Sequence, residues 1–253
     1  MTRDMEKYSQ NYINNEHDFE NIMVAIRRRK ILDILQNYSA KRILEVGCGL
    51  DGLFNYYTNY EYFVVMEPTK IFFDKACKDA QGISRIALIN DFLENQISIL
   101  QKQDFDFVIC SSLLHEVQNP KEFLKQIHFL AKEDTVIHVN VPNLKSFHLL
   151  WAHESGLINQ LGEMTETARK LQQNSTFDLI SLIKLIQRVS LDEKRNIEIL
   201  DKGSYFIKPF NHAKMSYCLK EGIVNNDLLN GLDGMVKYFP DSGAEIYINY
   251  KIL

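Results

Sequence analysis

The chain has 253 residues, 45% of them hydrophobic, which is enough to build one core of ordinary size. Its formal net charge is -4, whereas a dedicated nucleic-acid-binding protein normally carries a basic excess, so nucleic acid is not the expected partner. Crossing a bilayer takes about 20 apolar residues, and no apolar run approaches this length. The first residues also lack the apolar stretch of a signal peptide. We therefore expect a cytoplasmic protein without a membrane span.

The first predicted element is an amphipathic helix over residues 16–37. Its apolar side chains recur at helical spacing at Phe19, Ile22, Met23, Ile26, Ile31, Ile34 and Leu35. Such a helix either packs on the core or closes over a ligand. The basic run at residues 27–30 is expected on a solvated face, although one of its three arginines could turn inward and form forked hydrogen bonds to a ligand carboxylate.

Residues 42–49, Arg-Ile-Leu-Glu-Val-Gly-Cys-Gly, lead from a short apolar run into a glycine turn. The turn at Gly47, Cys48 and Gly49 lets the backbone fold tightly and lets a ligand approach main-chain N–H groups. It also matches the dinucleotide-type pattern G-x-G-x-x-G. The carboxylate of Glu45 would repel a pyrophosphate but attract the ammonium group of an amino acid. This combination favours S-adenosylmethionine, which has an amino-acid tail and no phosphate, as the cofactor.

Strand and helix patterns alternate from residue 41 to residue 141. Apolar runs rich in β-branched residues predict strands at 42–46, 62–66, 85–89, 105–110 and 135–141, with helical patterns at 70–80, 94–101 and 120–132. The alternation is typical of parallel strands joined by right-handed crossover helices. Because such sheets bind ligands beyond the carboxyl ends of their strands, we expect the site residues directly after each strand.

Acidic residues follow the second and third predicted strands. Glu67, with Pro68 after it, stands where a carboxylate can accept hydrogen bonds from ribose hydroxyls; the alternative is a simple strand cap. Asp91 and Phe92 follow the third strand, and an acid beside an aromatic ring suits adenine, one bonding its amine and the other stacking on it. The alternative for Asp91 is an N-cap of the helix at 94–101.

The fourth predicted strand leads into residues 110–117, Cys-Ser-Ser-Leu-Leu-His-Glu-Val, with Ser111 at the expected cofactor edge. These four strand-end features in register resemble the class I S-adenosylmethionine-dependent methyltransferases. The resemblance implies that the glycine turn and Glu45 lie beside the methionine part of the cofactor, that Glu67 binds its ribose and that Asp91 recognises its adenine. It also implies an α/β, doubly wound, Rossmann-like sheet of seven strands in the order 3-2-1-4-5-7-6, the last one antiparallel.

Later segments are similar to a narrower group, which methylates sugars for bacterial surface polysaccharides such as capsules. These segments are Val141-Pro142-Asn143 with Ser146 and His148, Ile207-Lys208-Pro209-Phe210-Asn211 with Met215, and Gly243-Ala244-Glu245-Ile246-Tyr247. This resemblance implies an O-methyltransferase acting on a hydroxyl of a small, nucleotide-activated sugar. Residues 165–175 depart from the expected pattern and leave the acceptor open.

The expected organisation is a single methyltransferase domain over the whole chain. Its parts are an N-terminal helical cap (1–40), a cofactor-binding core (41–141), a helical insertion that covers the acceptor site (142–195) and closing strands (196–253), with strand patterns at 196–207 and 244–252. The oligomeric state, monomer or homo-oligomer, stays open.

Methyl transfer to a hydroxyl requires removal of its proton, and an imidazole suits this task near neutral pH. His115, after the fourth strand, faces the expected position of the acceptor, and His148, after the fifth, is the competing choice of catalytic base. His128 and His138 fall in the middle of a predicted helix and strand, where a structural role is expected. No His, Asp or Glu cluster has the spacing of a metal site, so we predict metal-independent chemistry.

Three alternatives remain on the sequence alone. The first is N- or O-methylation of another small metabolite, including a phosphoryl-type capsule modification. The second is an NAD-dependent oxidoreductase, which G-x-G-x-x-G and Glu67 would suit; Glu45 and the absence of a Tyr-x-x-x-Lys pair after the fourth strand count against it. The third is a non-catalytic adenosine-binding subunit. The four cysteines, Cys48, Cys77, Cys110 and Cys218, show no CxxC spacing, which favours a reduced compartment.

Overall fold

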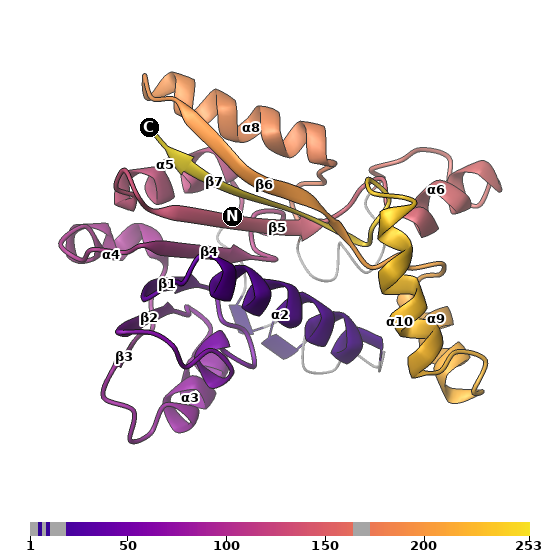
Figure 1. The fold of residues 1–253 in the computed structure, drawn as a ribbon, viewed down its shortest axis with the longest axis horizontal. Helices are drawn as coiled ribbons and strands as arrows, with labels where there is room; N and C mark the ends of the chain where they lie inside the picture. The colour runs from indigo at the N-terminus through magenta and orange to yellow at the C-terminus, as the bar shows by residue number, and fades with distance from the viewer. Residues whose placement is uncertain (1–4, 7–8, 11–18, 164–172) are drawn as a thin grey trace.

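The computed structural model describes residues 5–6, 9–10, 19–163 and 173–253, so residues 16–18 of the expected first helix and 164–172 of the expected insertion lie outside the described residues. Its centre is a seven-stranded sheet in the order β3-β2-β1-β4-β5-β7-β6 (Figure 1). The strands are β1 (Arg42–Val46), β2 (Tyr62–Met66), β3 (Ile86–Ile89), β4 (Phe107–Ser111), β5 (Val136–Pro142), β6 (Ile197–Tyr205) and β7 (Glu245–Ile252). Strands β1 to β5 pair in parallel, and β7 is antiparallel to both β5 and β6. The predicted strand order and the antiparallel last strand are confirmed.

Helices cover both faces of the sheet. They are α2 (Phe19–Asn37), α3 (Lys70–Asp79), α4 (Leu93–Leu100), α5 (Pro120–Leu130), α6 (Phe147–Glu154), α8 (Leu179–Asp192), α9 (His212–Lys220) and α10 (Asn226–Gly234), with short 3-10 helices η1 (Leu53–Asn55) and η2 (Met235–Lys237). Buried residues of α4, α5 and α8 belong to one hydrophobic cluster, and those of α2, α9 and α10 belong to the other. The protein therefore has three layers, with the sheet between two sets of helices.

The alternation of side chains along the strands explains the two clusters. On β1, Leu44 contributes to the cluster beneath α4, α5 and α8, whereas its neighbour Ile43 contributes to the cluster beneath α2. Val64 and Val65 divide in the same way on β2. Because both faces are covered, the central strands are mostly apolar on both sides, and this made the strands predictable from the sequence.

The first helix has the buried apolar face that the sequence predicts, whereas the predicted insertion is divided between two parts of the molecule. Six of the seven apolar residues expected to define the first helix are buried in α2, and the seventh, Ile22, is partly buried. Helix α8 packs through Leu182, Ile186 and Val189 into the sheet face beside α5. Two described parts of residues 142–195 lie at the carboxyl edge. They are α6 with its flanking loops (Figure 1) and the segment before α8, where Asn174 N donates to His115 O at 2.9 Å. The expected role as a cover stays a prediction for these parts.

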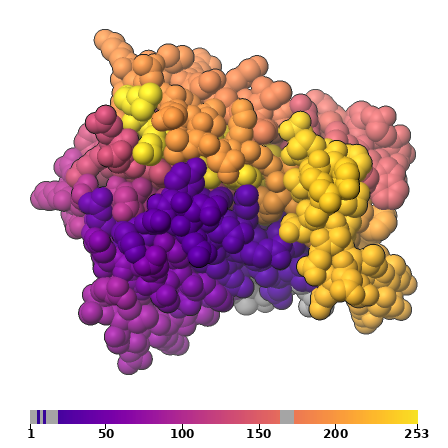
Figure 2. Space-filling model, viewed as in Figure 1, coloured from indigo at the N-terminus to yellow at the C-terminus, as the bar shows by residue number. Residues whose placement is uncertain are grey.

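Helices α9 and α10, between β6 and β7, have no counterpart among the elements expected from the sequence. Asn211 and Asn225 cap them through hydrogen bonds from Lys214 N and Leu228 N to the amide oxygens, each 3.0 Å long. Both helices contribute one or two buried residues only, so their apolar periodicity is weak in the sequence. In the space-filling view they form a lobe beside one end of α2 (Figure 2).

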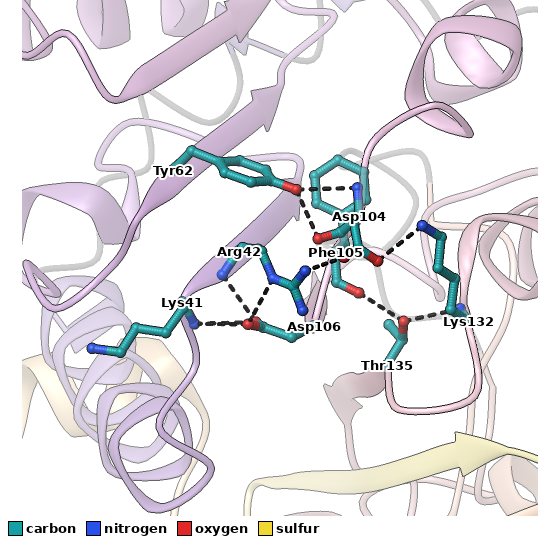
Figure 3. Close-up of polar contacts among 8 residues, drawn as sticks. All are labelled: Lys41, Arg42, Tyr62, Asp104, Phe105, Asp106, Lys132 and Thr135. Atoms are coloured by element: carbon teal, nitrogen blue, oxygen red, sulfur yellow. Dashed lines mark hydrogen bonds and ion pairs between the residues drawn. The ribbon is translucent and has the colours of Figure 1, made fainter.

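The amino-terminal edge of the sheet is held by a polar network (Figure 3). The Asp106 carboxylate accepts hydrogen bonds from the backbone N–H groups of Lys41 and Arg42 at 3.1 and 3.0 Å. Lys132 Nζ donates to Asp104 at 2.9 Å, and Tyr62 donates its hydroxyl proton to the Asp104 carbonyl at 2.7 Å. These bonds fix β1, β2 and β4 relative to one another and leave the opposite edge for ligands.

The carboxyl ends of β4 and β5 point to the side of the molecule where α6, α9 and α10 lie (Figure 1). Strand β7 begins at that same edge because it runs antiparallel to β5, with Glu245 opposite Pro142. Within the described ranges, no helix combines the length and apolar character that a bilayer crossing requires.

Candidate active site

The turn after β1 has the backbone conformation that its glycines allow. Gly47 and Gly49 have φ angles of +78° and +59°, in the left-handed region where a side chain is strained. Gly47 N donates to Met66 O at 2.7 Å, which holds the turn against the end of β2. A Cβ atom at Gly49 would find no atom within 4 Å, so this part of the turn faces open space. A ligand can therefore approach the main chain here, with Cys48 between the two glycines.

Glu45 lies beneath this turn. It is 3% exposed, and its carboxylate accepts a hydrogen bond from Leu53 N at 3.1 Å, at the beginning of η1. Burial, together with the nearby charges of Glu67 and Asp51, raises the pKa of Glu45 to about 8. The Glu45 carboxylate thus fixes the end of the glycine turn that leads into η1. The sequence predicted a place for Glu45 beside an ammonium group and did not indicate this contact.

Glu67 connects the ends of β1 and β2. Its two carboxylate oxygens accept hydrogen bonds from Gly49 N at 3.0 Å and from Thr69 N at 2.8 Å. The residue is 4% exposed, and this burial raises its pKa even though the backbone donors oppose the shift. A carboxylate offers about four lone-pair positions, so Glu67 can hold the turn and still accept from ribose hydroxyls.

Asp91 and Phe92 stand beside Glu67. Asn90, which precedes them, donates to the carbonyl oxygens of Glu67 and Pro68 at 2.8 and 3.2 Å, and so joins the ends of β2 and β3. The Asp91 carboxylate accepts hydrogen bonds from three donors on or just before α4, the side chains of Asn95 and Gln96 and Phe92 N, which lower its pKa. The ring of Phe92 is 45% exposed and available for stacking. Asp91 is not the N-cap of α4, as the alternative interpretation had it, because Phe92 holds that position. Its contacts with the first turn of α4 nevertheless fix it beside the exposed ring expected for an adenine site.

The loop after β4 lies against the glycine turn. Ser111 is the last residue of β4, and Ser112, with a φ angle of +51°, donates its N–H to Asn140 O on β5 at 3.0 Å. A Cβ atom at Gly47 would lie 3.7 Å from the side chain of Leu113. The structure thus brings Ser111 and the loop that contains His115 to the same edge as Glu45, Glu67 and the turn.

His115 is 4% exposed and lies with its Nε2 atom 3.8 Å from a carboxylate oxygen of Glu116. Its carbonyl oxygen accepts a hydrogen bond from Asn174 N at 2.9 Å, which ties the loop to the segment before α8. His148, on the first turn of α6, has its Nδ1 atom 3.0 Å from Ser146 Oγ. Burial and the charges of Lys208 and His212 lower the pKa of His148 to about 2.

The arginines of α2 all pair with carboxylates of the chain. The guanidinium of Arg27 donates from Nε to both oxygens of Glu245 at 3.0 Å. Arg28 pairs with Asp51, inside the glycine turn, and Arg29 pairs with Asp233 at 2.6 Å near the surface. Arg28 is therefore the arginine that the structure brings to the turn, through Asp51.

A second group of polar residues gathers where β5 ends and β7 begins, and we call it the β5–β7 corner. It comprises Glu20 and Arg27 of α2, Asn140 of β5, His148 of α6, Tyr205 of β6, Lys208 and His212 around the start of α9, and Glu245 of β7. Glu245 is its centre, since it also accepts from Asn140 Nδ2 at 2.8 Å and from the Tyr205 hydroxyl. Although burial would raise the pKa of Glu245, the Arg27 guanidinium and these two donors hold it below its usual value.

Three segments that the sequence analysis singled out for the narrower resemblance meet at this corner. Asn143, after β5, donates from Nδ2 to Asp241 O and Gly243 O, both at 2.9 Å, just before β7. Lys208, after β6, lies 3.4 Å from His212 and acts electrostatically on His148. Sequence reasoning did not single out Asn140, Tyr205 or Glu20. A signal existed for Asn140, a polar residue inside a mostly apolar strand, where burial demands a partner.

Among the described residues, no group of three or more His, Cys, Asp or Glu side chains is placed to hold a metal ion. The cofactor-edge residues fit S-adenosylmethionine on three observations: open space at Gly49, spare acceptor positions on Glu67 and an exposed ring at Phe92.

A family model described as a methyltransferase domain matches residues 23–198. Among solved structures, the plantazolicin methyltransferase BamL, in complex with a triazolic desmethylPZN analogue and SAH, superposes with a TM-score of 0.59 at 18% identity, covering 98% of this chain and 90% of that chain. The N-methyltransferase NodS from Bradyrhizobium japonicum WM9 gives 0.51 at 9% identity, with coverage of 89% and 96%. The methyltransferase domain of bacterial CtHen1 gives 0.55 at 11% identity, again with coverage of 89% and 96%. No curated protein is a significant match.

These identities are too low to carry more than the fold, and the fold agrees with the strand order described above. The family model covers more than half of the chain, from within α2 to the beginning of β6. The chain therefore belongs to the methyltransferase domain family.

Proposed function

We propose that this protein transfers a methyl group from S-adenosylmethionine to a hydroxyl of a small, nucleotide-activated sugar used for capsule or surface polysaccharide synthesis. The family assignment supports methyl transfer, and the solved neighbours crystallised with SAH support the choice of methyl donor. When bound, the cofactor supplies a methyl group already activated by its sulfonium. The protein has to hold the cofactor, align the acceptor and remove the hydroxyl proton.

The cofactor would be held at the edge formed by the glycine turn and the ends of β2 to β4. The N–H groups of the turn and the buried carboxylate of Glu45 suit the amino-acid part. Glu67, with Pro68, suits the ribose, and Asp91 with Phe92 suits the adenine. Ser111 lies next to the turn, at the end of β4.

His115 is the better candidate for the catalytic base. Its loop contacts the glycine turn through Leu113, which brings it to the cofactor edge. The carboxylate of Glu116, 3.8 Å from His115 Nε2, would stabilise the imidazolium formed when the proton is taken up. His148 is less suited, because burial and neighbouring positive groups lower its pKa to about 2 and so oppose its protonation.

The observation that carries the sugar acceptor is the meeting of the segments around Asn143, Lys208 and Glu245 at the β5–β7 corner. These segments are far apart in the sequence, yet their buried polar side chains gather at the same sheet edge as the glycine turn. A cytoplasmic reaction also fits the four cysteines, all of which are free thiols.

A panel of nucleotide sugars, incubated with S-adenosylmethionine and the protein, tests the proposal by mass spectrometry. We expect one member to gain the mass of a single methyl group, and O-linkage to follow from its fragmentation. A panel of small amines and phosphorylated metabolites serves as the comparison. Methylation confined to that second panel would contradict the proposed acceptor.

A further inference from the structure

Lys208 is a buried cation in the β5–β7 corner. The residue is 5% exposed, and among the described residues its only hydrogen-bonding partner is His212 Nδ1, 3.4 Å from its Nζ atom. Because His212 Nδ1 faces an ammonium donor, its Nε2 atom must carry the imidazole proton, and Nε2 lies 3.1 Å from the Glu20 carboxylate. The Glu20 carboxylate is therefore already paired with His212.

The carboxylate of Glu245, the other acid near Lys208, also has hydrogen-bonding partners within the protein. Glu245 accepts hydrogen bonds from Arg27, Asn140 and Tyr205, which occupy most of its lone pairs. Within the described part of the chain, Lys208 Nζ forms no ion pair with either acid. A buried ammonium without a close anion is unfavourable, so the corner favours an anion supplied from outside.

The lowered pKa of Lys208 agrees with the absence, among the described residues, of an ion pair between its ammonium and Glu20 or Glu245. Burial lowers the pKa of Lys208 to about 8, and the charge of Arg27 adds to the lowering, while Glu20 and Glu245 act against it without offsetting it. An anion beside Lys208 would raise that pKa again. Anion binding near pH 8 must then be accompanied by proton uptake.

The start of α9 adds to the positive character of the corner. Helix α9 begins at His212, four residues after Lys208, and Asn211 caps it by accepting from Lys214 N. Helix N-termini favour anions through their exposed N–H groups and their dipole. The His212 side chain is 32% exposed. The buried amine of Lys208 therefore contacts a side chain that reaches the surface.

An aromatic pair joins the segment that contains Lys208 to α6. Phe210, two residues after Lys208, has its ring centroid 5.4 Å from that of Trp151 on α6. Trp151 is 48% exposed. An exposed aromatic face can stack on a base or pack against the apolar face of a sugar ring.

We propose that the β5–β7 corner binds the phosphate groups of the acceptor through the ammonium of Lys208, with the ring of Trp151 against the nucleoside or sugar. This inference rests on the proposed function, because it assigns a position to the diphosphate of the nucleotide-activated sugar.

Calorimetry with uridine diphosphate as the probe and uridine as its uncharged counterpart tests the inference. We expect uridine diphosphate to bind the wild-type protein at least 10-fold more tightly than uridine. Lys208→Met should lower the affinity for uridine diphosphate at least 10-fold, and Lys208→Arg should lower it less. Lys214→Met, which removes an exposed lysine of the same helix, should leave it within twofold. Equal affinities in wild type and Lys208→Met would overturn the proposal.

The wild-type protein supplies a second measurement that does not depend on the folding of a variant. Affinity for uridine diphosphate should fall at least fivefold between pH 7 and pH 9, as the ammonium of Lys208 loses its proton. The titratable and charged groups that act on Lys208 are Glu20 and Arg27 of α2, His148 of α6, His212 of α9 and Glu245 of β7, and Tyr205 of β6 is bonded to Glu245. An affinity that does not change over this range would also overturn the proposal.

The same experiments separate this inference from the proposed function. If uridine diphosphate binds through Lys208 but no nucleotide sugar is methylated, the proposed function fails and the phosphate site stands. If a nucleotide sugar is methylated and Lys208→Met changes neither its KM nor the affinity for uridine diphosphate, the phosphate site fails and the proposed function stands.

Discussion

The carboxylate of Glu67 accepts a hydrogen bond from Gly49 N at 3.0 Å, so the residue that ends β2 is joined directly to the glycine turn after β1. A second bond, from Thr69 N at 2.8 Å, fixes the other carboxylate oxygen. One buried side chain thus shapes the turn and presents acceptor positions at the place proposed for the cofactor ribose.

Replacing Glu67 by Ala should weaken binding of S-adenosylhomocysteine by about 1–3 kcal/mol, because the ribose hydroxyls and two backbone N–H groups lose their acceptor. Calorimetry measures this change. Glu61→Ala removes an exposed carboxylate just before β2 and serves as the matched control, with no change expected. Equal affinity in both variants would show that Glu67 only caps the strand.

The Arg27–Glu245 pair should contribute strongly to stability. Their side chains are 16% and 3% exposed, and Arg27→Met leaves the Glu245 carboxylate buried without its guanidinium. Breaking a buried ion pair in this way costs about 3–5 kcal/mol. Arg29→Met, which removes a pair whose side chains are 53% and 36% exposed, should cost less than about 1 kcal/mol.

Urea unfolding of the two variants measures the difference in the free energy of unfolding. A double variant, Arg27→Met with Glu245→Gln, should recover part of the loss because it no longer buries a lone charge. Similar losses for Arg27→Met and Arg29→Met would contradict the importance assigned to this pair.

Stability should fall with acid in part through His138. Burial lowers its pKa from 6.5 to about 4, although hydrogen bonds to the amide oxygens of Asn249 and Asn140, which favour the protonated ring, oppose the shift. Between these values the unfolded chain binds a proton that the folded chain does not, so stability falls as the pH falls from 6.5 towards 4. The slope from one such group is at most about 1.4 kcal/mol per pH unit.

His138→Gln should therefore flatten the pH dependence of the unfolding free energy between pH 6.5 and 4. His153→Gln removes a histidine of α6 whose side chain is 38% exposed and serves as the control substitution. Denaturant titrations at several pH values provide the measurement. A slope unaffected by His138→Gln would mean that this histidine is protonated as easily in the folded state as in the unfolded one.

His115→Asn should lower kcat for methyl transfer by about 10²–10⁴ and leave the affinity for S-adenosylhomocysteine within twofold, since proton removal would be lost and cofactor binding kept. The acidic limb of the kcat profile should disappear in the same variant. His148→Asn should have the smaller effect. The reverse order would exchange the two roles, and full activity in both variants would exclude an imidazole base.

The sheet could be predicted from the sequence because both of its faces are covered. Strands β1 and β2 have the predicted bounds, since each is a short, mostly apolar run that is followed by a glycine or a charged residue. Helices α9 and α10 could not be predicted, because so few of their residues are buried that the apolar period is weak.

The cofactor edge could be predicted from the sequence, whereas the β5–β7 corner could not. The positions of Glu45 and Glu67 follow from local order, a strand and then a turn, and the structure brings both to one edge. The contact of Arg27 with Glu245 joins residues 218 positions apart, and no local pattern indicates which carboxylate a buried arginine will meet. The β5–β7 corner therefore required the structure.

The central claim is that the cofactor edge binds S-adenosylmethionine and its demethylated product rather than a dinucleotide. Calorimetry of the wild-type protein with S-adenosylhomocysteine and, separately, with NAD tests it most directly. The account predicts saturable binding of S-adenosylhomocysteine with one site per chain and no measurable heat with NAD. Tight binding of NAD without a response to S-adenosylhomocysteine would contradict it.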